Sequence, residues 1–116
     1  MADRILRWFI EGKINQIRTK VGGSHRLDDH YIPLEVFLSL RKAAKGSRPI
    51  NVNIFDDGES IFDDKPAITE GMTEKVWTTI PEEVMREGSI VTLNIDQVAN
   101  EEDGQDLTIE LTLKRE

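Results

Sequence analysis

Two strictly alternating stretches near the carboxyl end constrain the fold more than any other feature of the sequence. In residues 91–95 and 107–113 every second residue is Val, Leu or Ile, and Thr, Asn or Glu stands between them. Because successive side chains of a β-strand point to opposite faces, this pattern predicts strands with one buried and one solvated face. The acidic connection between them, residues 100–104, cannot be core.

A longer run of the same kind covers residues 31–41. Its apolar side chains at alternate positions are expected to share one face: Ile32, Leu34, Val36, Leu38 and Leu40. Pro33 lies within this run, and proline has no backbone N–H to donate to a neighbouring strand. That end is therefore predicted to be an edge or a bulge.

The middle of the chain carries a hairpin signal. Alternation predicts that Ile50, Val52 and Ile54 point inward and that Asn51 and Asn53 point outward. Asp57-Gly58 follows and leads to the apolar segment 60–62; both residues tolerate the positive φ of a two-residue type I′ turn. A short strand at 75–79 carries Trp77, and Ile68 is expected to anchor the connection before it.

The amino-terminal stretch allows two interpretations. Alternation of Leu6, Trp8 and Ile10, broken at Glu11-Gly12, favours two short strands around a turn. The alternative is an amphipathic helix, because apolar residues also recur at helical spacing from residue 6 to residue 21. Further on, residues 81–86 suggest one or two helical turns, with Thr79 and Glu82 as a capping box.

Together these patterns predict an all-β fold, an antiparallel β-sandwich of jelly-roll type with one short helix near residues 81–86. Residues 1–22 would form an amino-terminal strand pair or arm and residues 23–116 the sandwich, within a single domain. At 116 residues, one core is expected.

Composition narrows the classes of function. The chain has no cysteine, which excludes disulfides, thiolate catalysis and cysteine-based zinc sites. Its apolar runs are shorter than a membrane span and no leader peptide is evident, so we expect a soluble, unsecreted protein without membrane contact. The net charge of −7 disfavours nucleic acid.

The charge is unevenly distributed. Residues 1–26 contain six Lys or Arg against two Asp or Glu, whereas the remainder contains nine basic and twenty acidic residues. A basic arm on an acidic body could dock onto a neighbouring subunit; the alternatives are that the acidic surface serves solubility alone, or that the amino-terminal strands complete the chain's own sandwich.

Three separated segments resemble small β-sandwich domains of tailed-bacteriophage structural proteins, such as fibre, collar and accessory capsid proteins. They are the isoleucine-proline strand at Ile32-Pro33, a proline-led strand at 49–54 ending in Asp57-Gly58 with "SIF" at 60–62, and the closing "GSIVTLNIDQV...DLTIELTL" from Gly88. These are fold motifs without catalytic or ligand residues. The chain is more acidic than that family, and residues 81–86 stand where the family often has only a loop.

The resemblance implies a non-enzymatic virion protein assembled in the host cytoplasm, without a cofactor. We favour a capsid decoration or cement subunit. The alternatives are a tail, collar, baseplate or fibre-attachment subunit, or, from another class, a carbohydrate-binding module. Its partners would be capsid or other virion proteins, and a homo-oligomer, most simply a trimer, is expected. The candidate partner-contact residues are Arg4, Arg7, Trp8, Phe9, Ile10 and Arg18.

Other chemistry is less well supported by the residues. His25 and His30 could bind a metal, and Ser24, His25 and Asp28 are triad residue types, but a local cluster does not provide converging ligands or triad geometry. The doublets Asp56-Asp57 and Asp63-Asp64 could hold calcium if the hairpin brought them together. The aromatic residues Trp8, Tyr31 and Trp77 are interpreted as core, with a sugar-stacking platform as the alternative.

Overall fold

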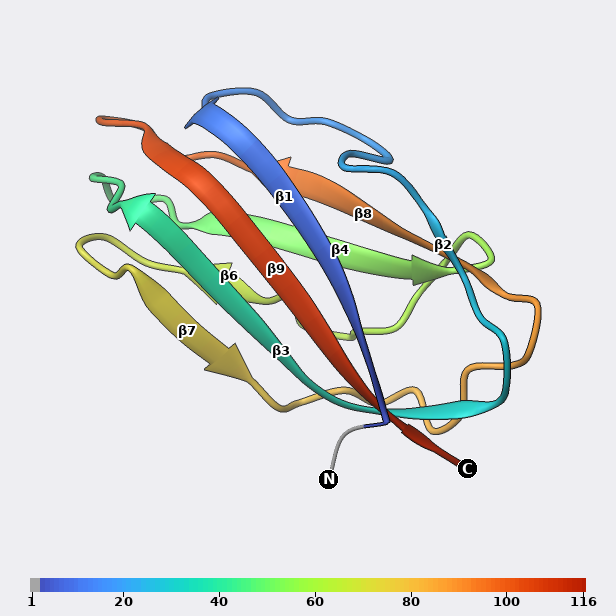
Figure 1. Ribbon diagram of the computed structural model, residues 1–116. Coiled ribbons are helices and arrows are strands. Elements are labelled where there is room, and N and C mark those ends of the chain that lie inside the picture. The colour runs from blue at the N-terminus through green and yellow to red at the C-terminus, as the bar shows by residue number, and fades with distance from the viewer. Residues whose placement is uncertain (1–2) are drawn as a thin grey trace.

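Alternating burial along the long strands produces two antiparallel sheets that pack face to face (Figure 1). The structure is a computed structural model and describes residues 3–116. One sheet, called sheet A here, has the order β1 (Arg4–Ile14), β9 (Gly104–Arg115), β3 (Tyr31–Lys42), β7 (Glu74–Trp77). The other, sheet B, has the order β2 (His25–Arg26), β8 (Ile90–Gln97), β4 (Ile50–Asp56), β5 (Glu59–Ser60), and β6 (Ala67–Ile68) also pairs with β4.

The chain passes from one sheet to the other at almost every connection. Strands β1, β3, β7 and β9 lie in sheet A, and β2, β4, β5 and β8 lie in sheet B. When the two-residue β6 is set aside, the orders β1-β9-β3-β7 and β2-β8-β4-β5 are those of an eight-stranded jelly roll. The predicted all-β antiparallel sandwich is therefore confirmed.

The interior between the sheets is a single apolar core. The inward positions of β8 and β9 are at most 1% exposed, as their alternation predicted. β1 contributes to the same core through Leu6, Trp8, Ile10 and Ile14, and it pairs with β9 along most of its length. β1 is thus part of the sandwich of its own chain; residues 1 and 2 of the predicted arm lie outside the described residues.

The prediction of two short strands at the amino terminus is wrong, because β1 is one strand interrupted by a bulge. The register with β9 shifts between Ile10 and Lys13, and Gly12 in the bulge has φ of +84°. Its N–H donates to Asp106 Oδ1 over 2.6 Å. Glu11-Gly12 therefore interrupts the alternation without reversing the chain. The helical alternative is also excluded.

A second bulge changes the phase of β3. The register with β9 shifts between Pro33 and Glu35, which confirms the irregularity predicted at the proline. As a result Tyr31 and Pro33 are buried at this end of the strand, and Leu34 is 37% exposed. The prediction that Ile32 and Leu34 share the buried face of Val36 is wrong, because it assumed unbroken alternation.

The hairpin between β4 and β5 is confirmed. Asp57 and Gly58 have φ of 49° and 86°, the two positive values of a type I′ turn, and Phe55 pairs with Ser60 beside them. Asn53, predicted to point outward, is 4% exposed, and its Oδ1 accepts a hydrogen bond of 2.7 Å from Ser60 Oγ.

The prediction of a short helix at residues 81–86 is wrong, because no helix occurs in residues 3–116. This segment belongs to the irregular crossover between β7 and β8. Met85 exchanges two backbone hydrogen bonds with Tyr31, of 2.7 and 2.8 Å, and its side chain is fully buried. These long-range bonds and this burial outweigh the local preference of a short segment for a helical turn.

Candidate functional site

The six residues predicted to contact a partner fall into two groups. Trp8 is 0% exposed and Ile10 is 6% exposed, so both side chains belong to the core of this chain. The prediction that these two residues contact a partner is therefore wrong. Their neighbour Phe9, on the opposite face of β1, is 55% exposed. Arg7 and Arg18 are also exposed, and Arg4 is half-buried. Because side chains alternate along β1, the predicted contact residues on this strand are divided between its buried face and its exposed face.

Side chains close the seam between the edge strands β1 and β2. Trp8 Nε1 donates to Gly23 O over 3.0 Å, and His25 Nε2 lies at hydrogen-bonding distance, 3.0 Å, from Arg7 O. The rings of Trp8 and His25 pack edge to face with centroids 5.0 Å apart. Trp8 therefore joins the two sheets as well as filling the core.

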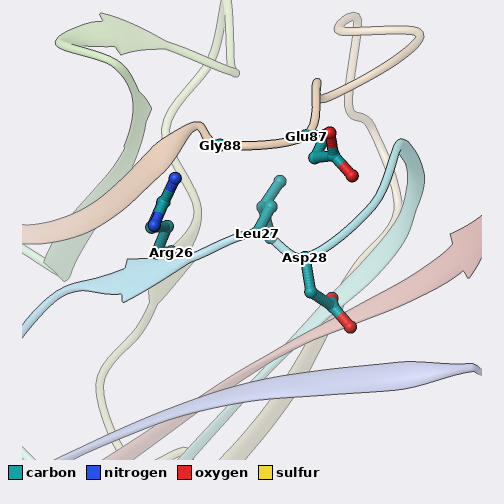
Figure 2. A pocket seen from close by; sticks show the side chains of 5 residues that line it. All are labelled: Arg26, Leu27, Asp28, Glu87 and Gly88. Carbon is teal, nitrogen blue, oxygen red and sulfur yellow. The ribbon is translucent and has the colours of Figure 1, made fainter.

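A shallow polar hollow of about 410 Å³ lies next to this seam (Figure 2). Arg26, Leu27 and Asp28 line one side, and Glu87 and Gly88 line the other. Backbone hydrogen bonds hold the two segments together: Leu27 N donates to Ser89 O and Gly88 N donates to Leu27 O. In Figure 2 the Arg26 and Asp28 side chains extend in different directions, so the charged groups do not converge on one point.

Asp28 in this hollow is a structural acceptor. The Tyr31 hydroxyl donates to its Oδ1 over 2.7 Å, and Arg4 donates to the same oxygen over 2.7 Å. The Tyr31 bond is the largest cause of a lowered pKa at Asp28, and the same bond together with burial raises the pKa of Tyr31. Because its partners are Tyr31 and Arg4, Asp28 does not orient His25, and Ser24, His25 and Asp28 do not form a triad.

Two of the candidate metal ligands accept backbone hydrogen bonds. His30 Nδ1 accepts from Glu87 N over 3.0 Å, and Asp57 Oδ1 accepts from Ile90 N over 2.8 Å. Within residues 3–116 no group of three or more His, Asp or Glu side chains is arranged to hold a metal ion. The calcium interpretation of the two Asp doublets therefore finds no support in the geometry.

The aromatic residues are not displayed as a platform. Trp8 is 0% and Tyr31 is 1% exposed, which confirms their interpretation as core. Trp77 is half-buried against the core, and its Nε1 donates to Thr79 O over 3.2 Å. A stacking surface for sugars does not form from these three residues.

The outer face of sheet A presents exposed apolar side chains to a partner. Register places Arg7, Glu110, Phe37 and Val76 in one row across the four strands β1, β9, β3 and β7. Arg7 and Glu110 form an ion pair at the β1–β9 end of this row. Exposed apolar side chains stand on the two edge strands: Ile5 at 49% and Phe9 at 55% on either side of Arg7 in β1, and Val76 at 49% in β7 at the other edge.

The sequence prediction missed Ile5, Phe37 and Val76 in this surface. Ile5 and Phe9 share the phase opposite to Leu6 and Trp8, and that signal was available once β1 was taken as a strand. Val76 joins them only through pairing of β7 with β3, which no local pattern shows.

No helix within residues 3–116 is long and apolar enough to cross a membrane. No known protein family, curated protein sequence or solved structure matches the chain.

Proposed function

We propose that this chain is a non-enzymatic structural subunit of a tailed-bacteriophage particle, and we favour a decoration or cement protein of the capsid shell. The observation that carries the proposal is the jelly-roll strand order, because jelly rolls are an architecture of viral capsid domains. A fold alone does not specify a function, so the second support is where the phage-like segments lie.

Those segments form a connected part of the structure. Ile32-Pro33 lies in β3, residues 49–54 enter and form most of β4, and Asp57-Gly58 with Ser60 forms the hairpin into β5. The closing segment supplies β8 and β9, which pair with β4 and β3 respectively. The segments that carry the resemblance therefore pair with one another, as they would in a shared fold.

The outer face of sheet A is the proposed contact surface. It exposes the apolar side chains Ile5, Phe9 and Val76 on its two edge strands, and Arg7 between Ile5 and Phe9 forms an ion pair with Glu110. On a chain of net charge −7, apolar side chains and a paired glutamate reduce the repulsion of an acidic neighbour, including another copy, at this face. We propose that it contacts a virion protein, and that the subunits form a homo-oligomer, with a trimer favoured, in the particle.

A tail, collar, baseplate or fibre-attachment subunit is the alternative within the same class, and the same face would serve it. The jelly-roll strand order is also that of lectin domains, so the fold is compatible with the carbohydrate-binding alternative. No aromatic stacking platform supports it, because Trp8 and Tyr31 are buried and the indole N–H of Trp77 is bonded to the backbone.

The test is co-sedimentation of the purified chain with separated heads and tails of the phage that encodes it, prepared without the chain. Phe9→Asp places a charge at the proposed contact, and Ile90→Asp is the matched control because Ile90 is 41% exposed on sheet B. We expect the wild type and Ile90→Asp to bind heads and Phe9→Asp to lose about tenfold or more in affinity, since hot-spot aromatics typically contribute ~2 kcal/mol. Circular dichroism confirms that both variants are folded. Binding to tails instead selects the tail alternative, and binding to neither overturns the proposal.

A further inference from the structure

The crossover between β7 and β8 brings an acidic side chain to the end of the core. A hollow of about 390 Å³ lies between this crossover and the β4–β5 hairpin. Its lining contains four carboxyl groups and one cation, together with two uncharged residues: Asp56, Asp57, Glu59, Glu82, Arg86, Val84 and Ser89.

Two of these carboxyl groups face each other. Asp56 continues the alternation of Val52 and Ile54 and pairs with Val91, a core residue, so its side chain is directed toward the interior at the end of β4. Glu82 approaches it from the crossover, three residues before the buried Met85. The Oε2 atom of Glu82 is buried and has no hydrogen-bond partner among residues 3–116.

A proton on Glu82 supplies the missing hydrogen-bond donor and removes one of the two negative charges. With both groups ionised, the buried oxygen lacks a donor and two negative charges lie close together. When Glu82 is protonated, the pair shares one hydrogen bond and carries one charge. Burial is the largest cause of the raised pKa of Glu82, followed by the hydrogen bond to Asp56 and the charges of Asp56 and Glu59, which together bring it to about 7.

We propose that a proton held between Glu82 and Asp56 fastens the β7–β8 crossover to the end of β4, and that its loss as pH rises loosens this end of the sandwich. The groups that face Glu82 are Asp56 from β4, Asp57 from the turn and Glu59 from β5, with Arg86 on its own segment as the one cation of the hollow. The inference is independent of the proposed function.

The direction of the pH dependence follows from the raised pKa. A carboxyl group whose pKa rises from 4.5 in the unfolded chain to about 7 in the folded one contributes its stability below pH 4.5 and loses it as pH increases through 7. The loosening is expected first at the crossover, where the Met85 amide donates to Tyr31 O over 2.7 Å.

The experiment compares the wild type with Glu82→Gln, which keeps a donor and cannot ionise, and with Glu83→Gln, an exposed neighbour that controls for the loss of one charge. Thermal unfolding is followed from about pH 5 to about pH 8.5. We expect Tm of the wild type and Glu83→Gln to fall about 3–6 °C further over this range than Tm of Glu82→Gln. The two histidines are common to all three proteins, so they do not distinguish the three melting curves.

Two direct measurements accompany the melting curves. NMR titration of the Glu82 carboxyl carbon should give a pKa near 7, and hydrogen exchange of the Met85 amide should accelerate with pH beyond its chemical rate in the wild type but not in Glu82→Gln. A Glu82 pKa in the ordinary range near 4.5, or the same pH dependence in Glu82→Gln as in the wild type, would overturn the proposal.

Discussion

Truncation of Trp8 tests whether β1 belongs to the sandwich of its own chain. The side chain is 0% exposed, and a buried aromatic residue removes roughly 150–250 Å² from water. At about 25 cal/mol per Å² this corresponds to ~4–6 kcal/mol, in line with the ~3–5 kcal/mol typical of Trp→Ala in a core. The substitution also leaves Gly23 O without its donor. We therefore expect Trp8→Ala to lower the free energy of unfolding by about 4 kcal/mol.

The matched control is the next residue. Phe9→Ala removes an aromatic side chain that is 55% exposed on the opposite face, and we expect a loss below ~1 kcal/mol. Urea unfolding followed by far-ultraviolet circular dichroism measures both. If Trp8→Ala does not fold, Trp8→Phe, which removes the N–H donor and part of the ring, should still cost ~1–2 kcal/mol. Equal losses of unfolding free energy for Trp8→Ala and Phe9→Ala would refute the placement of β1 in the core. They would favour the alternative interpretation, an amino-terminal arm that contacts a neighbouring subunit.

Three further outcomes follow from the geometry. Gly58→Val should cost ~1–3 kcal/mol in urea unfolding because φ of +86° excludes a β-branched residue, and Gly58→Asn should cost clearly less; equal losses would contradict the type I′ turn. Leu38→Ala should cost ~2–5 kcal/mol and Leu34→Ala under ~1 kcal/mol, since the bulge exposes Leu34; the reverse order would disprove the phase change. At low pH, Asp106 contributes to the pH dependence of stability. The hydrogen bond from Arg41 is the largest cause of its lowered pKa, followed by the hydrogen bond from the Gly12 amide. The stabilising contribution of Asp106 is therefore present above its ordinary pKa of 3.8 and is lost as pH falls. Asp106→Asn should flatten the decline of Tm below about pH 4, and an unchanged decline would show that Asp106 does not contribute to it.

The strands with unbroken alternation could be predicted from sequence. Leu93, Ile95, Leu107 and Leu111 are buried as expected, because a two-residue period with one wet face has few other solutions in a folded chain. The Asp57-Gly58 turn could also be predicted, since its positive φ values demand particular residue types.

The predictions from sequence were wrong where contacts with residues distant in the chain determine the local conformation. The bulge at Gly12 is held by Asp106, 94 positions away, and the bulge near Pro33 shifts the phase against β9. Residues 81–86 have a local helical signal, but Met85 is bonded to Tyr31 and buried. Short-range patterns carry no information on such partners.

The candidate sites also depend partly on local sequence patterns and partly on contacts between distant segments. The exposed face of sheet A could be predicted in part from the phase of Ile5 and Phe9 along β1. The pairing of Val76 with Phe37, which extends that face, and the approach of Glu82 to Asp56 both depend on strand order. Strand order in a jelly roll is set by contacts between sheets and not by any single segment.

The most direct test of the proposed function is quantitative mass spectrometry of gradient-purified phage particles from cultures that produce this chain. We expect the chain to be present in the particle at a fixed copy number relative to the major capsid protein and to remain associated with heads after tails are removed. Its presence in the lysate together with its absence from purified particles would contradict the proposed function.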